Sequence, residues 1–585
     1  MMIHHQKTAQ EIFEELEYRS NNYILIHFNA FITNTPNGIT IKCNDEEDWW
    51  YHQLVGKSID ITELKSVLID TDWSEYFKDK EEGLYEFKLL LSIDIGTTAI
   101  KAGCFSIDGK MIASAYLEYP LIKTKRWQVE QDANLWWKLA VRVIKEVLSK
   151  IDSNINEIIA MSISAQGISY VPVDDLGRPL LNAFSWLDTR AVEQADRMKN
   201  LFTSQSEAFH HLGLHIVPTY TLPKIMWLKD NESEIFEKTH KFSTCLDFIN
   251  NKLIGEFITD YSIAGGTLAH NIQHLCWAED VLKQVEVPLS KLPLIDWAGT
   301  PIGVIKPEVA CELGLPKGVQ LVLGGHDQEC AALGAGLRKR EVSISMGTAS
   351  ILVAPVDQPI FDSALRIPCY PHIEKGQFVL EAVVSAAGIS FRWLRDFFNM
   401  IMVDHDASRY DYEGIIELAK NSPPGANGVK FFPHLSGATS PFWNPNASGV
   451  FYDLSLATNP ADIARSLLEG WCYQLKTNLM VIEELTSCPE NVIMFGGGTR
   501  SKFIQKLLAD IIGFPILVSS TSETALLGAA MLAGYGAGIY SDMEDAKGMV
   551  RKKVDECSND HKISKTYHGL FEHYREIEEL LIFNV

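Results

Sequence analysis

A short apolar run ends in a carboxylate, a glycine and two threonines at residues 89–98, as Leu-Leu-Leu-Ser-Ile-Asp-Ile-Gly-Thr-Thr. The run predicts a buried strand, which would hold Asp94 at a fixed point. Gly96 permits a tight backbone turn, and the hydroxyl and N–H groups of Thr97 and Thr98 can face phosphate oxygens. The segment therefore predicts a phosphate-binding turn.

The same pattern returns at residues 342–353, where a strand, a Gly347-Thr348 turn and a second strand follow one another. The two copies indicate two similar halves, each giving one phosphate loop to a cleft where ligands commonly bind. Coincidence is the alternative, because Gly-Thr turns are common between strands. Strand and helix patterns alternate along the chain, which is typical of an α/β fold. Strands are expected at 102–107, 111–119, 158–163, 319–323, 342–345 and 492–495, and a helix at 133–149.

The length, the net charge and the cysteine spacing of the chain argue against several classes of function. A chain of 585 residues is long for one core, so two or three domains are expected. The formal charge of −23 opposes a role in binding nucleic acid. No run approaches membrane-spanning length, and the cysteines lack the spacing of metal ligands or of a disulfide framework. We therefore expect a cytoplasmic protein with reduced thiols and with neither a membrane nor a nucleic acid as partner.

Residues 1–87 are expected to form a separate α+β extension, for which the sequence suggests no role. A helix is predicted at 9–19, and strands are predicted at 23–32 and 39–43 around a turn at 34–38. The charged stretch at 78–83 is a plausible boundary before the phosphate turn.

Two more glycine-containing segments could carry chemistry. In the first, an apolar strand ends at Gly324-Gly325, and Asp327 then opens a helix of small residues. Its carboxylate could accept a proton from a bound hydroxyl, or it could simply cap the helix. In the second, three glycines at 496–498 separate a strand from an amphipathic helix. Bare backbone there could lie against a flat ring or a phosphate, although a tight strand-to-helix connection is the alternative.

From about residue 89 to residue 540 the chain resembles the FGGY carbohydrate kinases, which share the actin and sugar-kinase ATPase fold. The motifs that carry the resemblance lie at 94–98, 127–132, 164–166, 186–190, 221–228, 325–328, 345–348, 448–451, 464–469, 496–498 and 527–530. The resemblance implies two ribonuclease H-like domains of the actin/hexokinase type flanking a cleft. The implied divisions are a sugar-binding domain at 88–338, a nucleotide-binding domain at 339–545 and a C-terminal helical tail at 546–585.

The resemblance also implies a reaction, in which ATP and Mg²⁺ phosphorylate a hydroxyl of a small sugar, ketose or polyol. Asp327 would be the general base, and Asp94 and Asp327 would hold Mg²⁺. The implied contacts to ATP are Asp94, Gly96, Thr97, Thr98, Lys101, Gly347, Thr348, Gly497 and Gly498. The implied acceptor site consists of Gln166, Trp186, Asp188, Arg190, Asp327 and Gln328. For Asp188 and Arg190 the alternative is a salt bridge that merely fixes the loop.

The sequence says less about which molecule accepts the phosphoryl group. A xylulose-like substrate is the first expectation, but Gly167-Ile168 follow Gln166 where xylulokinases have Met-His, so a polar group that could meet the sugar is absent. Two other classes stay open, namely a conformational ATPase of the actin or chaperone type and a carbohydrate-sensing regulator without catalysis. A homodimer is the assembly considered.

Overall fold

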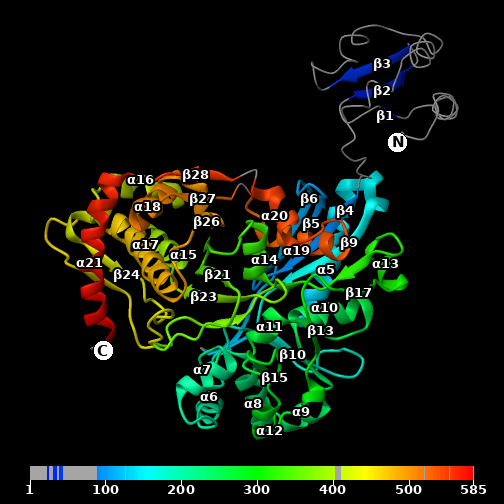
Figure 1. Cartoon of the computed structure of the whole chain (residues 1–585), viewed down its shortest axis with the longest axis horizontal. Helices are drawn as coiled ribbons and strands as arrows, with labels where there is room; N and C mark the ends of the chain where they lie inside the picture. Colours follow the sequence, from blue (N-terminus) through cyan, green and yellow to red (C-terminus); the bar gives the residue numbers. More distant parts are fainter. Residues whose placement is uncertain are drawn as a thin grey trace. The chain divides into compact units, whose positions relative to one another are not determined.

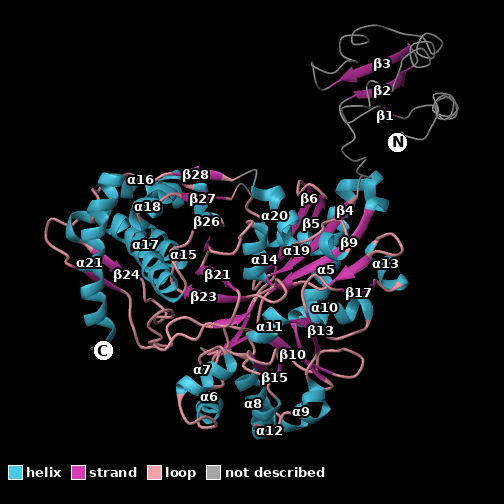
Figure 2. Ribbon diagram, viewed as in Figure 1, coloured by secondary structure: helices cyan, strands magenta, loops and turns pink. Residues whose placement is uncertain are grey.

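The computed structural model is shown in Figures 1 and 2. It describes residues 23–25, 30–35, 38–43, 88–125, 127–401, 410–519, 521–551 and 554–583. The chain divides into two units, Met1–Glu86 and Phe87–Val585, and each is described by itself. In the part of the chain that is described, no helix combines the length and the apolar character needed to cross a membrane.

The first unit contains an antiparallel sheet of β1 (Tyr23–Leu25), β2 (Ala30–Thr35) and β3 (Gly38–Cys43). One continuous strand over 23–32 was expected, and this is wrong. β1 and β2 instead pair with each other, with Ile24 opposite Ile32, so the chain reverses between them. The predicted helix at 9–19, the centre of the turn at 36–37 and the stretch at 78–83 lie outside the described residues.

The second unit opens with a sheet that begins as an antiparallel meander. Its strands are β4 (Leu89–Ile95), β5 (Ala99–Ser106), β6 (Met111–Glu118), β9 (Ile158–Ala165), β17 (Pro301–Val304), β18 (Gln320–Val322) and β19 (Gly325–His326). β4, β5 and β6 are antiparallel, whereas β9 runs parallel to β4, and β18 and β19 run parallel to β9. The predicted apolar helix is α5 (Ala133–Ile151), which packs on β5 and β6 through buried residues such as Trp136 and Val143.

A second sheet repeats this topology. Its strands are β20 (Glu341–Met346), β21 (Ser350–Val356), β22 (Cys369–Pro371), β23 (Phe378–Val384), β26 (Asn491–Phe495), β27 (Ile516–Val518) and β28 (Asp555–Cys557). β20, β21 and β23 form an antiparallel meander, β26 runs parallel to β20, and β27 runs parallel to β26. The echo in the sequence therefore reflects two halves of the same α/β design.

Helices and short strands complete each half. A smaller sheet of the first half contains β7 (Ile122–Lys125), β8 (Gln128–Gln131), β10 (Tyr170–Val173), β11 (Ala183–Phe184) and β12 (Lys241–Thr244). The first half also contains α6 (Val192–Lys199), α7 (Gln205–Leu212), α8 (Thr221–Asn231), α9 (Ser233–Lys238), α10 (Cys245–Ile254), α11 (Tyr261–Gly265), α12 (Glu279–Gln284) and α13 (Pro307–Leu313), with β13 (Ile258–Asp260), β14 (His270–Asn271), β15 (Cys276–Trp277) and β16 (Leu294–Asp296). The second half adds α15 (Gly388–Ile401), α16 (Tyr412–Lys420), α17 (Pro460–Leu485), α18 (Lys502–Ile512), α20 (Met543–Arg551) and α21 (His561–Phe583), with β24 (Lys430–Phe432) and β25 (Val450–Tyr452). The segment expected as a helical tail thus also supplies β28 to the second sheet.

Two helices cross where the halves meet. α14 (Asp327–Gly334) belongs to the first half, and α19 (Thr524–Gly536) belongs to the second, yet α19 packs on β4 and β9 of the first sheet (Figure 1). The crossing is close because glycines lie at the contact. A Cβ atom on Gly528 would stand 1.8 Å from the carbonyl oxygen of Cys330, and one on Gly334 would stand 1.9 Å from that of Thr524.

Gly528→Ala should therefore destabilise the protein. The added methyl group meets backbone that cannot rotate away, and overpacking of this kind costs about 1–3 kcal/mol or more. Gly569→Ala is the matched control, because Gly569 lies inside α21 with nothing within 4 Å of its would-be Cβ. That change should add about 0.5–1 kcal/mol through helix propensity. Urea unfolding measures both, and equal midpoints for the two variants would contradict the close crossing.

Candidate active site

Three parallel strands of the first sheet end side by side. In the β4–β9 ladder Asp94 lies opposite Ser164, and in the β9–β19 ladder Gly325 lies opposite the same serine. Ser164 Oγ donates a 2.7 Å hydrogen bond to Asp94 Oδ1. Gln166 follows β9 directly, and Asp327 opens α14 directly after β19. The sheet therefore gathers Asp94, Gln166 and Asp327 at one edge.

The two aspartates are half-buried and interact with each other. Burial, and then the nearby Asp327 carboxyl, raise the pKa of Asp94 to about 6. Burial raises the pKa of Asp327 to about 7. Two carboxyl groups at one site suit Mg²⁺, which commonly takes one or two protein carboxylates and completes its shell with phosphate oxygens and water. Among the described residues no group of three or more candidate metal ligands occurs, so a metal here would depend on a bound phosphate.

Lys101 is already paired. It lies opposite Asp94 in the β4–β5 ladder, but its Nζ forms a 2.7 Å ion pair with Glu523, the residue before α19. Both side chains are part-buried, at 31% and 25% exposure. No local pattern indicates Glu523, because only the crossing of α19 onto the first sheet brings it close to Lys101.

The second phosphate turn lies beside the glycine loop. Gly347 and Thr348 join β20 to β21, and the loop at 496–498 leaves the neighbouring parallel strand β26. A Cβ atom on Gly498 would stand 2.7 Å from that of Met346, the last residue of β20. Gly347, Thr348 and Gly497 are exposed. Four of the predicted ATP contacts, counting Gly498, are thus gathered at one end of the second sheet.

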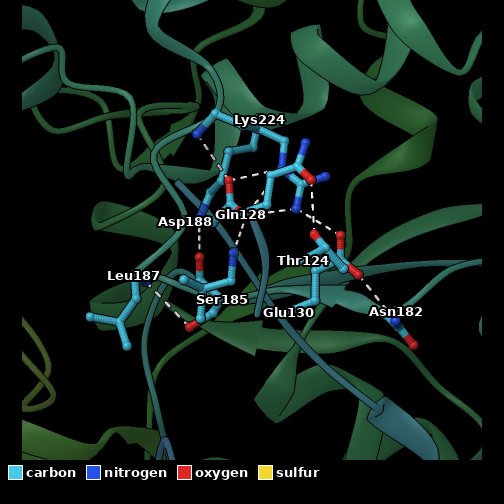
Figure 3. Close-up of polar contacts among 10 residues, drawn as sticks. Thr124, Gln128, Glu130, Asn182, Ser185, Leu187, Asp188 and Lys224 are labelled. Atoms are coloured by element: carbon cyan, nitrogen blue, oxygen red, sulfur yellow. Dashed lines mark hydrogen bonds and ion pairs between the residues drawn. The ribbon is translucent and has the colours of Figure 1, made fainter. Parts of the chain in front are cut away.

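Asp188 and Arg190 form a buried ion pair. Asp188 is fully buried and accepts from the Val129 backbone N–H at 2.7 Å and from Arg190 Nη2 at 2.6 Å. Arg190 also pairs with Glu130 at 2.7 Å, and its guanidinium lies over the rings of Phe184 and Trp227, 4.5 Å and 4.9 Å from their centroids. Figure 3 shows Asp188 and Glu130 in this network. The loop-fixing salt bridge considered as the alternative is therefore present.

Trp186 connects this loop to the first phosphate turn. Its Nε1 donates to Thr97 Oγ1 at 2.8 Å, and its backbone N–H donates to Ser169 Oγ. Lys224 is fully buried and donates to the Ser185 carbonyl at 2.9 Å (Figure 3). Burial lowers the pKa of Lys224 to about 7. The motif at 221–228 contained Lys224, but nothing in the sequence indicated that its ammonium group binds the backbone of Ser185, next to Trp186.

Gln166 lies behind the turn. It is 1% exposed, and its Oε1 accepts from Ser169 Oγ at 3.1 Å and from Gln131 Nε2 at 3.3 Å. Gln131 also donates to the Thr97 carbonyl at 2.7 Å. The structure thus places the Gln166 side chain against Gln131, which in turn holds the turn that contains Thr97. Gln328 follows Asp327 in the first turn of α14 and is half-buried.

Comparisons with known proteins agree with this architecture. The FGGY family of carbohydrate kinases matches with its N-terminal domain over residues 89–334 and its C-terminal domain over residues 342–537. The xylulose kinase of Bacillus subtilis (strain 168) is 28% identical over 495 residues, covering 84% of this chain and 96% of that one. The gluconokinase of the same organism is 28% identical, covering 79% and 90%. The crystal structure of gluconate kinase from Lactobacillus acidophilus has a TM-score of 0.78 at 28% identity, covering 85% and 99%. The two family domains together span most of the chain, which therefore belongs to the FGGY family of carbohydrate kinases.

Proposed function

We propose that the protein transfers the γ-phosphoryl group of ATP to a hydroxyl of a small sugar, ketose or polyol, with Asp327 as the general base. The observation that carries the proposal is the position of Asp327, at the carboxyl end of a parallel strand beside Asp94. A carboxyl with a pKa of about 7 is suited to taking a proton at neutral pH. The family and the named relatives, which include xylulose and gluconate kinases, support the same class of reaction.

Different residues of the chain would then accept the proton, bind the phosphate groups and hold the metal. Asp327 takes the proton of the attacking hydroxyl as that oxygen approaches the γ-phosphorus. Thr97, Thr98, Gly347 and Thr348 contact phosphate oxygens, and Trp186 fixes the Thr97 hydroxyl through its indole N–H. Bound Mg²⁺, held by Asp94 and Asp327, would neutralise phosphate charge. Phosphoryl transfer needs mainly such alignment and charge neutralisation, so no covalent enzyme intermediate is required.

A substrate panel tests the proposal. Release of ADP from Mg-ATP is followed with pentuloses, hexuloses, aldonates and polyols, each against a blank without acceptor. At least one acceptor should raise the rate well above the blank. ATP hydrolysis that responds to a protein partner and to no carbohydrate would instead favour a conformational ATPase, and binding without turnover would favour a regulator.

A further inference from the structure

One strand of the second half presents a single charged residue to the first half. Strand β23 reads Phe-Val-Leu-Glu-Ala-Val-Val, and its alternate residues Phe378, Leu380, Ala382 and Val384 enter the core of the second half. Val379, on the other face, packs in a cluster with first-half residues such as Leu268 and Ala331. Because side chains alternate along a strand, Glu381 shares the face of Val379. Tyr370 Oη donates a 2.5 Å hydrogen bond to Glu381 Oε2.

Glu381 lies near Asp327, one of the residues expected to bind the acceptor. Its carboxyl interacts electrostatically with Asp327 and His326. After burial, it is also a cause of the raised pKa of Tyr220, the residue before α8. Thr221, the first residue of α8, donates through Oγ1 to the Ile168 carbonyl at 2.8 Å. The second half therefore adds a carboxyl group to the site that contains Asp327.

His326 occupies the space beside Gly167. A Cβ atom on Gly167 would stand 2.6 Å from the imidazole, so a larger residue at this position would displace the ring. The His326 Nε2 lies 3.3 Å from Asp327 Oδ1. The imidazole thus lies where a side chain at position 167 would stand.

Three basic residues near the site, Lys101, Arg190 and Lys224, already have partners. Arg190 is bound by Asp188 and Glu130, and Lys101 is bound by Glu523. Lys224 is buried and directed at a carbonyl. Mg²⁺ would compensate Asp94 and Asp327, but a carboxylate on the acceptor would still meet the Glu381 carboxyl, and like charges at one partly buried site disfavour each other. Hydroxyl groups, in contrast, can donate to these carboxylates.

We propose that the acceptor site selects an uncharged ketose or polyol over an aldonate, and that Glu381 is the residue that makes this selection. The inference rests on the proposed kinase function and specifies its substrate class.

The test compares kcat/KM for uncharged pentuloses, hexuloses and polyols with that for aldonates, gluconate included, at saturating Mg-ATP. The best uncharged acceptor should exceed every aldonate by about 10²-fold or more, because a site built for hydroxyl donors leaves its polar groups unpaired with the wrong ligand. Glu381→Gln should reduce this ratio about tenfold, the free-energy equivalent of one hydrogen bond to a charged group. The change should appear mainly in the KM of the acceptor, with the KM of ATP unaltered. Glu413→Gln, at an exposed residue in the first turn of α16 in the same half, is the control and should leave the ratio unchanged.

Each outcome is decisive. An aldonate as the best acceptor overturns the selection while leaving the kinase function in place, and this result needs no variant. No response to any acceptor overturns both proposals. An unchanged ratio in folded Glu381→Gln overturns the assignment to Glu381, and if that variant fails to fold, Glu381→Asp should retain the ratio while raising the acceptor KM.

Discussion

Asp327→Asn should lower kcat by about 10²–10⁴-fold, the usual contribution of a positioned general base. The amide keeps the size of the carboxyl but cannot take the proton of the attacking hydroxyl. ATP binding should persist, because the predicted contacts at the second phosphate turn and the glycine loop belong to a different sheet. ADP release with the best acceptor measures kcat, and calorimetric titration measures the affinity for ATP.

Asp296→Asn is the matched control for this variant. Asp296 is a half-buried aspartate at the end of β16 in the same half of the protein, and its carboxylate accepts from the Trp297 backbone N–H. Its replacement should leave kcat nearly unchanged. An unchanged kcat in Asp327→Asn would place the base elsewhere, and loss of ATP binding would assign Asp327 to the nucleotide.

Asp188→Ala should destabilise the protein by roughly 3–5 kcal/mol, because breaking a buried ion pair leaves an uncompensated charge. The Arg190 side chain is 5% exposed, so water cannot replace the lost partner, although Glu130 keeps the cost toward the lower value. The Val129 backbone N–H loses its acceptor as well. Urea unfolding measures the loss. We also expect a rise in the acceptor KM, because the loop carrying Trp186 loses its anchor.

Two controls separate charge from packing. Glu234→Ala breaks an exposed ion pair with Lys238 and should change stability little. Asp188→Asn combined with Arg190→Met removes both charges and should cost less than Asp188→Ala alone. A double variant as unstable as the sum of its parts would mean that the pair contributes through shape and not through compensation of charge.

Local pattern was sufficient to predict much of the fold. The two Gly-Thr turns were expected between strands, and each does join two strands, which the structure shows to be antiparallel. The helix expected at 133–149 is present as α5, and its apolar residues pack on the first sheet. Asp327 was recognised because it follows an apolar run that ends in two glycines, although its catalytic role is still a prediction.

Contacts between residues far apart in the sequence were not predicted. Glu523 reaches Lys101 only because α19 crosses onto the first sheet, and Glu381 reaches the acceptor region only because β23 turns one face toward the first half. Strand spacing says which face a residue shares with its neighbours, but not what will pack against that face. The salt bridge between Asp188 and Arg190 was considered from the sequence, but the second partner of Arg190, Glu130, depends on the pairing of β8 with β11.

The crossing of α19 also means that the two halves are not separable pieces of chain. One face of the first sheet, with Leu90, Ala160 and Val322, is covered by α19 residues such as Leu526 and Ala530. A fragment that ended at residue 338 would keep every strand of its sheet and lose the cover of that face. It should aggregate when expressed alone and regain solubility when residues 339–585 are supplied as a second chain, so that the protein would tolerate a break in its backbone but not the loss of either partner.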